Sequence, residues 1–223
     1  MRVRITFSKT GPLKYIGHLD LQSLWERAAR RAGLPLAYTN GFHPQPRIYF
    51  ASALPLGFTS RCEVVDLRLN QDVDLTDLPG RLQATMPSGI SIMKVDSVDE
   101  LTPALQTQVI AAEYEVTLRG NLAISAEPSA FHPPNSGLDS ASPCMRQRMK
   151  ELLERPSILR ERRGKPYDLR PLIEKLEVLL EDKIFMRLTA REAATGRPEE
   201  VLAALGITLE DVRIERTSLI FQG

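Results

Sequence analysis

The alternation of apolar and polar residues at the start of the chain is the feature that most restricts its fold. In residues 2–7, RVRITF, apolar side chains occupy every second position, which predicts a strand with one buried face. Residues 21–33, LQSLWERAARRAG, instead repeat their apolar side chains at helical spacing. We expect Asp20 to cap the start of this helix, and Gly33 followed by Pro35 to end it.

The rest of the first half continues with further strand and helix patterns. Residues 47–57 and 61–70 predict two strands joined by a turn, residues 74–86 predict a short helix, and residues 89–98 predict a strand. The order is therefore β-α-β-β-α-β within 98 residues. This order is typical of the split βαβ unit, which is also called ferredoxin-like.

The second half allows the same interpretation, although the two halves share only the order of their elements. A strand is predicted in residues 112–120, a basic helix in 144–155, a strand in 183–190, a helix in 198–206 and a strand in 211–221. Residues 157–180 contain a basic turn, RERRGK, and predict either two strands or one strand and an extended segment. We therefore predict an α+β protein made of two tandem ferredoxin-like (βαββαβ) units with antiparallel sheets.

These patterns divide the chain into two expected domains. The first is a basic N-terminal domain over residues 1–98, and the second is a C-terminal domain over residues 112–223. Residues 121–143 are rich in Ser, Pro, Ala and Asn without periodicity, so we expect a long loop insert there.

Composition is ordinary for a soluble globular protein, with 43% hydrophobic and 26% charged residues among 223. No apolar run approaches the roughly 20 residues that span a bilayer, and the N-terminus does not resemble a signal peptide. We expect a cytoplasmic protein that does not bind membranes. Cys62 and Cys144 lie far apart and offer neither a disulfide framework nor metal spacing. No nucleotide-binding motif is present either, so we expect no metal or cofactor.

Charge is distributed unevenly along the chain. Residues 1–61 contain nine Lys or Arg against two Asp or Glu, whereas residues 62–143 contain four against twelve. Such asymmetry favours a polyanionic partner for the basic part, and we expect RNA, either tRNA or another structured RNA.

The candidate nucleic-acid contacts are cationic and aromatic residues in two clusters. In the first half they are Lys14, Arg27, Arg30, Arg31, Phe42, His43, Arg47 and Tyr49, and in the second half Arg162, Arg163 and Lys165. Cations would contact phosphates and exposed aromatic rings would stack on unpaired bases. The alternative is an ordinary solvated surface for the cations and core packing for the aromatic rings, as we expect for Phe7 and Phe50.

Catalysis on RNA is the second functional class to consider. His18 and Asp20 could form an acid–base pair, and His43 lies in the constrained loop GFHPQPR. The alternative is that Asp20 caps the helix, that His18 bonds to backbone, and that the His43 loop is a rigid connector. The sequence contains no complete catalytic constellation, so we favour a protein without enzymatic activity.

The segments FSKTGPLKYIGHLDL, WERAARRAGLPLAYTNGFHPQPRIYFASALPLG and SRCEVVDLRL closely resemble the radical-SAM-linked protein family. RGKPYDLRPLI and the RPEEVLAALG segment resemble C-terminal landmarks of the same family, so the resemblance covers nearly the whole chain apart from residues 121–143. It implies a companion of a radical SAM enzyme, a domain of unknown function found alone or joined to such enzymes. The chain has no CxxxCxxC motif to hold an iron–sulfur cluster, so it cannot itself be the radical SAM catalyst.

Three functional hypotheses follow. The first is a non-catalytic RNA-binding or adaptor protein that works with a radical SAM enzyme in RNA modification or processing. The second is a metal-independent enzyme that processes or modifies RNA. The third is a protein–protein interaction module that does not bind RNA and uses residues 62–143 or 121–143 as its docking surface.

Overall fold

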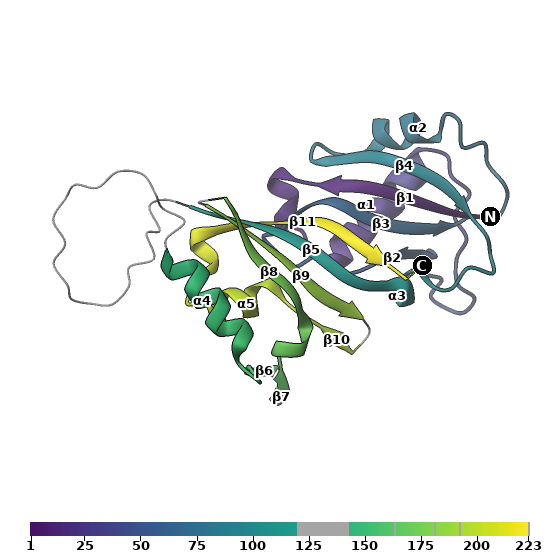
Figure 1. The fold of residues 1–223 in the computed structure, drawn as a ribbon. Helices are drawn as coiled ribbons and strands as arrows, with labels where there is room; N and C mark the ends of the chain where they lie inside the picture. The colour runs from purple at the N-terminus through teal and green to yellow at the C-terminus, as the bar shows by residue number, and fades with distance from the viewer. Residues whose placement is uncertain (120–142, 163, 181, 192, 223) are drawn as a thin grey trace. The chain divides into compact units, whose positions relative to one another are not determined.

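The computed structural model describes residues 1–119, 143–162, 164–180, 182–191 and 193–222 (Figure 1). These residues form two compact units. The first unit comprises Met1–Ile110 together with Glu215–Gly223, and the second comprises Ala111–Ile214. The change of unit at residue 110 lies between the two expected domains, but the end of the chain belongs to the first unit. The expected insert at 121–143 lies outside the described residues except for Pro143.

The described residues contain helices and mostly antiparallel strands. The strands are β1 (Arg2–Lys9), β2 (Ile48–Phe50), β3 (Thr59–Arg68), β4 (Ile90–Val98), β5 (Val109–Leu118), β6 (Leu159–Arg162), β7 (Lys165–Asp168), β8 (Ile173–Leu180), β9 (Lys183–Arg191), β10 (Ala194–Thr195) and β11 (Val212–Phe221). The α-helices are α1 (His18–Arg31), α2 (Leu78–Thr85), α3 (Leu105–Gln108), α4 (Pro143–Glu154) and α5 (Pro198–Ala204). The 3-10 helices are η1 (Gly11–Tyr15), η2 (Arg170–Leu172) and η3 (Leu209–Asp211).

Strand β1 is central to the sheet of the first unit. It pairs antiparallel with β3 on one side and with β4 on the other, and β3 pairs antiparallel with β2 (Figure 1). The order is therefore β4-β1-β3, with β2 beyond β3. The C-terminal part of β11 runs parallel to β3, with Glu215 opposite Thr59 and Arg216 opposite Ser60.

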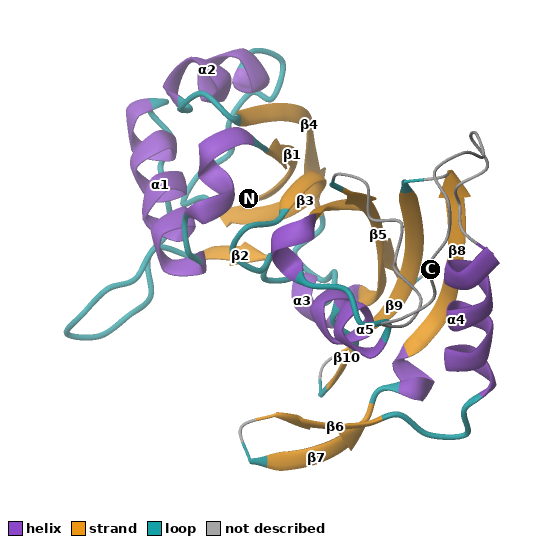
Figure 2. Ribbon diagram, turned by 90° about the vertical axis from the view of Figure 1, so that its left-hand side faces the viewer, coloured by secondary structure: helices purple, strands orange, loops and turns teal. Residues whose placement is uncertain are grey.

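The apolar face of β1 confirms the alternation that the sequence predicts. Val3, Ile5 and Phe7 are buried, and the Phe7 ring meets the ring of Trp25 edge-on at 4.9 Å between centroids. Helices α1 and α2 lie together on one side of the strands in Figure 2, and their buried residues join this core. Truncating a core aromatic such as Phe7 to Ala would cost about 3–5 kcal/mol.

Two predicted helix starts are wrong. Helix α1 begins at His18 rather than after Asp20, and the Asp20 carboxylate reaches back to accept a bond from the Gly17 N–H at 3.4 Å. Helix α2 begins at Leu78 rather than at Asp74, because the Asp74 carboxylate accepts a bond from the Thr76 N–H and holds a turn there.

The second unit is built around β9, which pairs antiparallel with β5 on one side and with β8 on the other. Strand β10 returns beside the end of β9, and α4 contacts β8. The basic turn expected near residue 162 connects a two-stranded antiparallel hairpin of β6 and β7. Throughout the described residues, every helix is too short or too polar to cross a bilayer.

Candidate functional site

A buried ion cluster lies on the face of the first-unit sheet opposite the apolar core. Arg4 stands across from Asp66 in the β1–β3 register, and Arg2 stands across from Arg68. The Asp66 carboxylate accepts bonds from Arg2 Nε at 2.8 Å and from Arg4 Nε at 2.9 Å. Because Asp66 and Arg2 are buried, each carboxylate oxygen needs a charged donor, and the two guanidinium groups provide them.

Arg2 also forms hydrogen bonds with the segment that connects β4 to α3. Its Nη1 donates to the Thr102 carbonyl at 2.6 Å, and its Nη2 donates to the Pro103 carbonyl at 3.0 Å. The adjacent helix α3 buries Leu105. The segment is therefore held by charge-assisted bonds to backbone oxygens, and it forms one wall of a pocket.

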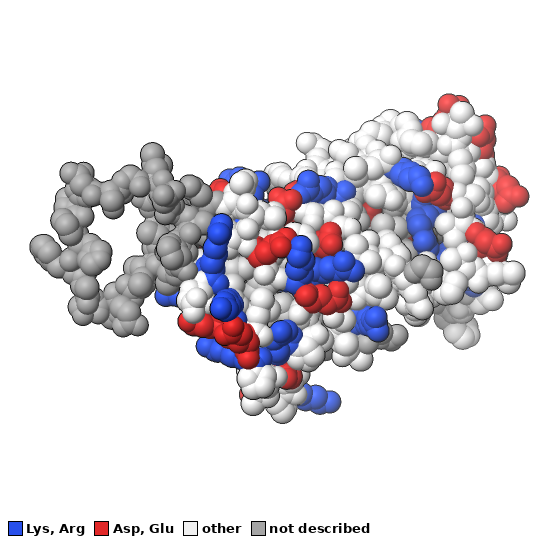
Figure 3. Space-filling view, in the orientation of Figure 1, with Lys and Arg blue, Asp and Glu red and all other residues white. Residues whose placement is uncertain are grey.

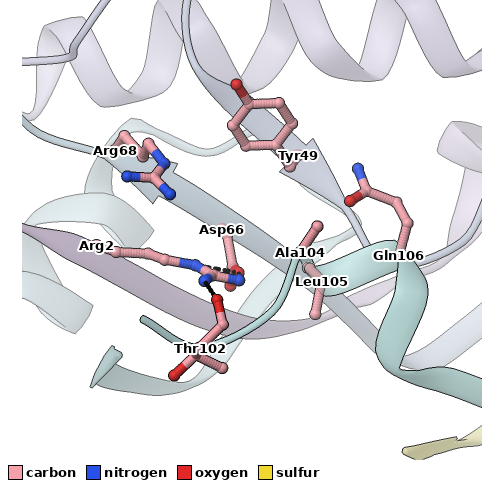
Figure 4. Close-up of a pocket in the computed structure, with 8 residues that line it drawn as sticks. All are labelled: Arg2, Tyr49, Asp66, Arg68, Thr102, Ala104, Leu105 and Gln106. Carbon is pink, nitrogen blue, oxygen red and sulfur yellow. Dashed lines mark hydrogen bonds and ion pairs between the residues drawn. The ribbon is translucent and has the colours of Figure 1, made fainter. Parts of the chain in front are cut away.

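This pocket has a volume of about 380 Å³ and lies entirely within the first unit. Its floor is the Arg2–Asp66 pair, and Figure 4 shows Tyr49, Arg68 and Gln106 on different sides of the space above that pair. The Tyr49 side chain is 39% exposed. Within the described chain, neither the Tyr49 hydroxyl nor the Gln106 carboxamide makes a hydrogen bond, so both are available to a ligand.

The chemistry of the pocket suits a flat, polar ligand. An aromatic ring offers a stacking surface, and a carboxamide offers both a donor and an acceptor to the edge of a base. Arg68 contributes a guanidinium that is ion-paired with Glu100 and two-thirds covered. The volume falls in the usual range of about 300–1,000 Å³ for small-ligand sites.

The predicted cations of the first unit remain largely at its surface. Arg27, Arg30 and Arg31 are exposed on α1, and Arg30 approaches Glu26 at 4.0 Å. Lys14 lies 4.8 Å from the centre of the Tyr15 ring, and Arg47 is half-buried beside β2. None of these five side chains lines the Tyr49 pocket.

Phe42 and His43 lie in a loop that projects between α1 and β2 (Figure 2). Tyr38 bridges Pro46 across the base of this loop, and the Thr39 N–H donates to the Gln45 carbonyl at 2.9 Å. Phe42 is fully exposed. The expectation of exposed rings is confirmed for Phe42 and Tyr49, whereas Phe7 and Phe50 are core residues as predicted.

His18 and Asp20 are not joined as an acid–base pair. The His18 ring meets Phe50 edge-on at 5.3 Å, and the Asp20 carboxylate caps the N-terminus of α1 through Gly17. No described hydrogen bond connects either residue to His43. The arrangement therefore favours packing and capping over proton transfer for His18 and Asp20.

In the second unit, Arg162 and Lys165 stand directly opposite one another on the β6–β7 hairpin. Arg163 lies outside the described residues. Arg162 and Lys165 line a pocket of about 370 Å³ together with Tyr167 and Thr195. Two cations of the expected basic cluster, Arg162 and Lys165, therefore lie side by side.

Charge of both signs is interspersed on the face drawn in Figure 3. Ion pairs such as Arg187 with Glu174 at 3.0 Å and Lys183 with Glu115 at 3.8 Å account for part of this mixture in the second unit. A polyanion would therefore meet local basic sites on this face rather than one uniform positive field.

The sequence did not indicate that Arg2 and Asp66 form the base of the Tyr49 pocket, or that Arg68 and Gln106 line it. Arg2 and Arg4 were placed on the polar face of β1 by their alternation, but nothing nearby in the chain indicated Asp66 as their partner. Gln106 carries no recognisable pattern. Long-range strand pairing brings these residues together, and spacing along the chain does not reveal it.

No curated protein matches the chain. A family described as an uncharacterized protein conserved in bacteria, DUF2344, matches residues 2–198, which include every residue of the Tyr49 pocket and of the β6–β7 hairpin. Since this match covers well over half of the chain, the protein belongs to the DUF2344 family.

Proposed function

We propose that this protein is a non-catalytic RNA-binding or adaptor protein that holds an unpaired nucleotide of its RNA in the Tyr49 pocket. The observation that carries the proposal is the exposed Tyr49 ring beside an unbonded Gln106 carboxamide in a pocket of base-accommodating size. Sheet-based RNA binders recognise single-stranded bases by the same combination of stacking and edge contacts.

Five cations of the same unit support the proposal, three of them exposed and two half-buried. Arg27, Arg30 and Arg31 lie on one helix, and Lys14 and Arg47 lie on neighbouring segments. Cations of this kind contact phosphates without reading sequence, and they make affinity strongly dependent on salt. The pocket would then contribute the preference for unpaired bases.

The test is RNA binding at several salt concentrations, with labelled tRNA and a labelled single-stranded RNA. In the test variant, five cations of the first unit are replaced by Ala: Lys14, Arg27, Arg30, Arg31 and Arg47. In the control variant, five exposed cations outside the proposed interface are replaced by Ala: Arg146, Lys150, Lys175, Arg191 and Arg213. Both variants lose the same charge, so only a localised interface separates them. We expect the test variant to bind weakly and the control to bind nearly as the parent does.

Two further variants isolate the pocket. Tyr49→Ala removes the stacking ring and should weaken binding of single-stranded RNA by about 5- to 150-fold, from the usual energy of one stacked base. Tyr49→Phe keeps the ring and should bind as the parent does. If Tyr49→Ala and Tyr49→Phe lost RNA affinity equally, the effect would belong to the hydroxyl. If neither variant lost affinity, the RNA would bind elsewhere.

The partnership with a radical SAM enzyme is supported by the family resemblance of the sequence. It is tested by sedimentation of the purified protein with a radical SAM enzyme of the same organism, with and without RNA. A complex that forms only with RNA fits an adaptor. A protein–protein interaction module would instead form the complex without RNA and would still form it after the five-cation substitution. It would also show no affinity for RNA.

Catalysis on RNA is the less favoured alternative, because His18 and Asp20 have packing and capping roles. Incubating RNA with the protein in the presence of a chelator tests it directly. Product formation that is abolished by His43→Ala would establish a metal-independent enzyme.

We propose in addition that both units follow the tandem ferredoxin-like design. The first unit has the element sequence β1-α1-β2-β3-α2-β4, and β1 and β3 are its inner strands. In the second unit, β9 lies between β5 and β8, which is the position of the third strand in that design, and the β6–β7 hairpin is an addition.

A further inference from the structure

The β6–β7 hairpin of the second unit gathers positive charge on one face. Side chains alternate between the two faces of a strand, so Arg160 and Arg162 share a face of β6. The residues paired with them across the hairpin are Tyr167 and Lys165, respectively, and these share the same face of β7. This face therefore carries three cations and one phenol in four paired positions.

The two cations nearest the turn have no carboxylate partner among the described residues. Arg160 approaches Glu200 at 3.9 Å, and nearby Arg197 approaches Glu199 at 3.4 Å. Arg162 and Lys165 form no such pair, although they stand directly opposite each other and are exposed. Like charges in this position destabilise a hairpin, so a bound anion would relieve a cost that the free protein carries.

A pocket of about 370 Å³ opens where these cations lie. Its described lining includes Arg162, Lys165, Tyr167, Thr195 and Ala193, and none of the described lining residues is acidic. Burial raises the pKa of Tyr167, and the charge of Glu200 raises it further, so the phenol stays protonated as a hydrogen-bond donor. The Thr195 hydroxyl donates its proton to the Arg191 carbonyl at 3.0 Å, so only the Tyr167 hydroxyl is a free hydroxyl donor among the described lining residues.

The backbone beside the pocket is strained. Ala193 has φ of +62°, in the left-handed region that favours glycine, and it is the only non-glycine residue of the described chain with a positive φ. Strained residues of this kind cluster at binding sites, where the surrounding structure holds them. Ala193 belongs to the tight turn between β9 and β10, where Arg191 pairs with Ala194, and turns of this kind require a positive φ. The proposal therefore rests on the charges and the pocket, and not on this strain.

We propose that this pocket binds a phosphate monoester group. Two cations that have no carboxylate partner among the described residues match the double negative charge of a monoester, and the Tyr167 hydroxyl can donate to one of its acceptor oxygens. An internal diester carries a single charge, so it matches these two cations less well. The inference does not depend on the proposed RNA function, because a phosphorylated small molecule and an RNA 5′ end present the same group.

The test uses the full-length protein and isothermal titration with inorganic phosphate, followed by a short oligouridylate with a 5′ phosphate and the same oligonucleotide with a 5′ hydroxyl. Arg162→Gln combined with Lys165→Gln should weaken binding of inorganic phosphate at least about tenfold, since each charge-assisted contact has an effect of that order. The matched control, Lys150→Gln combined with Arg213→Gln, should stay within about twofold of the parent, because these exposed cations lie outside the pocket.

The oligonucleotides distinguish the two sources of the group. Preference for the 5′-phosphorylated RNA over the 5′-hydroxyl RNA, lost in the test variant, would assign the pocket to an RNA end. Binding of inorganic phosphate without that preference would assign it to a small phosphorylated ligand. The proposal would be overturned if both RNAs bound equally well and inorganic phosphate did not bind. It would also be overturned if the test and control variants lost phosphate affinity to the same extent.

The pH dependence offers a second check on the same variants. The 5′-phosphorylated oligonucleotide should bind more weakly below about pH 6, where the monoester dianion takes up a proton, while sulfate should keep its affinity there. Parallel pH profiles for the two anions would contradict recognition of the dianion. The single variant Lys165→Gln serves if the double variant does not fold.

Discussion

Replacing Glu63 and replacing Lys9 should change the stability of the first unit in opposite directions. These residues and Arg216 are buried together, each no more than 2% exposed. Glu63 Oε1 accepts a bond from Arg216 Nη1 at 2.9 Å, and Lys9 Nζ donates to the Ile16 carbonyl at 3.3 Å. Glu63 attracts the Lys9 charge, whereas Arg216 repels it. The cluster therefore has two buried cations and one carboxylate.

The magnitudes follow from that imbalance. Glu63→Ala leaves a guanidinium and an ammonium buried without their carboxylate, and removing one partner of a buried pair costs about 3–5 kcal/mol. We expect the upper end of this range because a second cation is affected. Lys9→Met keeps most of the apolar stem and removes the excess charge, so we expect stability to rise by between 0 and about 2 kcal/mol.

The effect of Lys9→Met should depend on pH. Burial lowers the pKa of Lys9 below its usual 10.5. Between the lowered pKa and 10.5 the unfolded chain binds more protons than the folded chain, so the stability of the parent rises with pH in that window. The advantage of Lys9→Met is therefore largest below the lowered pKa and disappears as the pH approaches 10.5.

Urea unfolding followed by tryptophan fluorescence measures these differences in the first unit alone. Trp25 is the only tryptophan of the chain, and it is fully buried in the first-unit core. A result in which Lys9→Met destabilises as much as Glu63→Ala at neutral pH would refute the reasoning. Lys9 would then be a net stabilising partner of Glu63.

Three further predictions concern single positions. Burial raises the pKa of the Cys62 thiol to about 11, so in a Cys144→Ser background native protein at pH 8 should react with iodoacetamide at least about 100-fold more slowly than urea-unfolded protein. Ala193→Gly should stabilise the second unit by about 1 kcal/mol in thermal unfolding, because glycine removes the strain of a positive φ; a loss would show that this backbone is not strained. Asp66→Ala should lower the free energy of unfolding measured in urea by about 3–5 kcal/mol. Asp66→Asn should lower it clearly less, since the amide oxygen still accepts one of the arginine bonds. Equal losses in the two variants would contradict a charge-based role.

Local periodicity predicted β1, β3 and β4 of the first unit, because each pattern reports the environment of a single element. The strand predicted over residues 47–57 is wrong in length, since β2 covers only Ile48–Phe50. The alternation of Val3, Ile5 and Phe7 is determined by one buried face, and it is visible in the sequence alone. The start of α1 was misplaced because both Gly17 and Asp20 take part in capping, and an acidic residue near a helix start does not show which position it occupies.

The candidate site was only partly predictable, for a different physical reason. Tyr49 was expected at the surface, and it is exposed. Its pocket, however, depends on Arg2 binding the carbonyl oxygens of Thr102 and Pro103, about a hundred residues further along the chain. That contact is made with backbone atoms, which every residue type provides, so no side-chain pattern in that segment indicates it.

The burial of these charges also changes what the basic first part of the chain can offer to RNA. If all nine cations of residues 1–61 contacted phosphates, the logarithm of single-strand affinity would fall with the logarithm of salt at a slope of about 6. Three of them belong to buried clusters, namely Arg2, Arg4 and Lys9. Arg61 pairs with Glu215 at 3.6 Å. The five that remain are Lys14, Arg27, Arg30, Arg31 and Arg47, so we expect a slope of about 3.5 from this part. A measured first-unit contribution near 6 would require the buried clusters to open on binding, and the Trp25 fluorescence would report that opening.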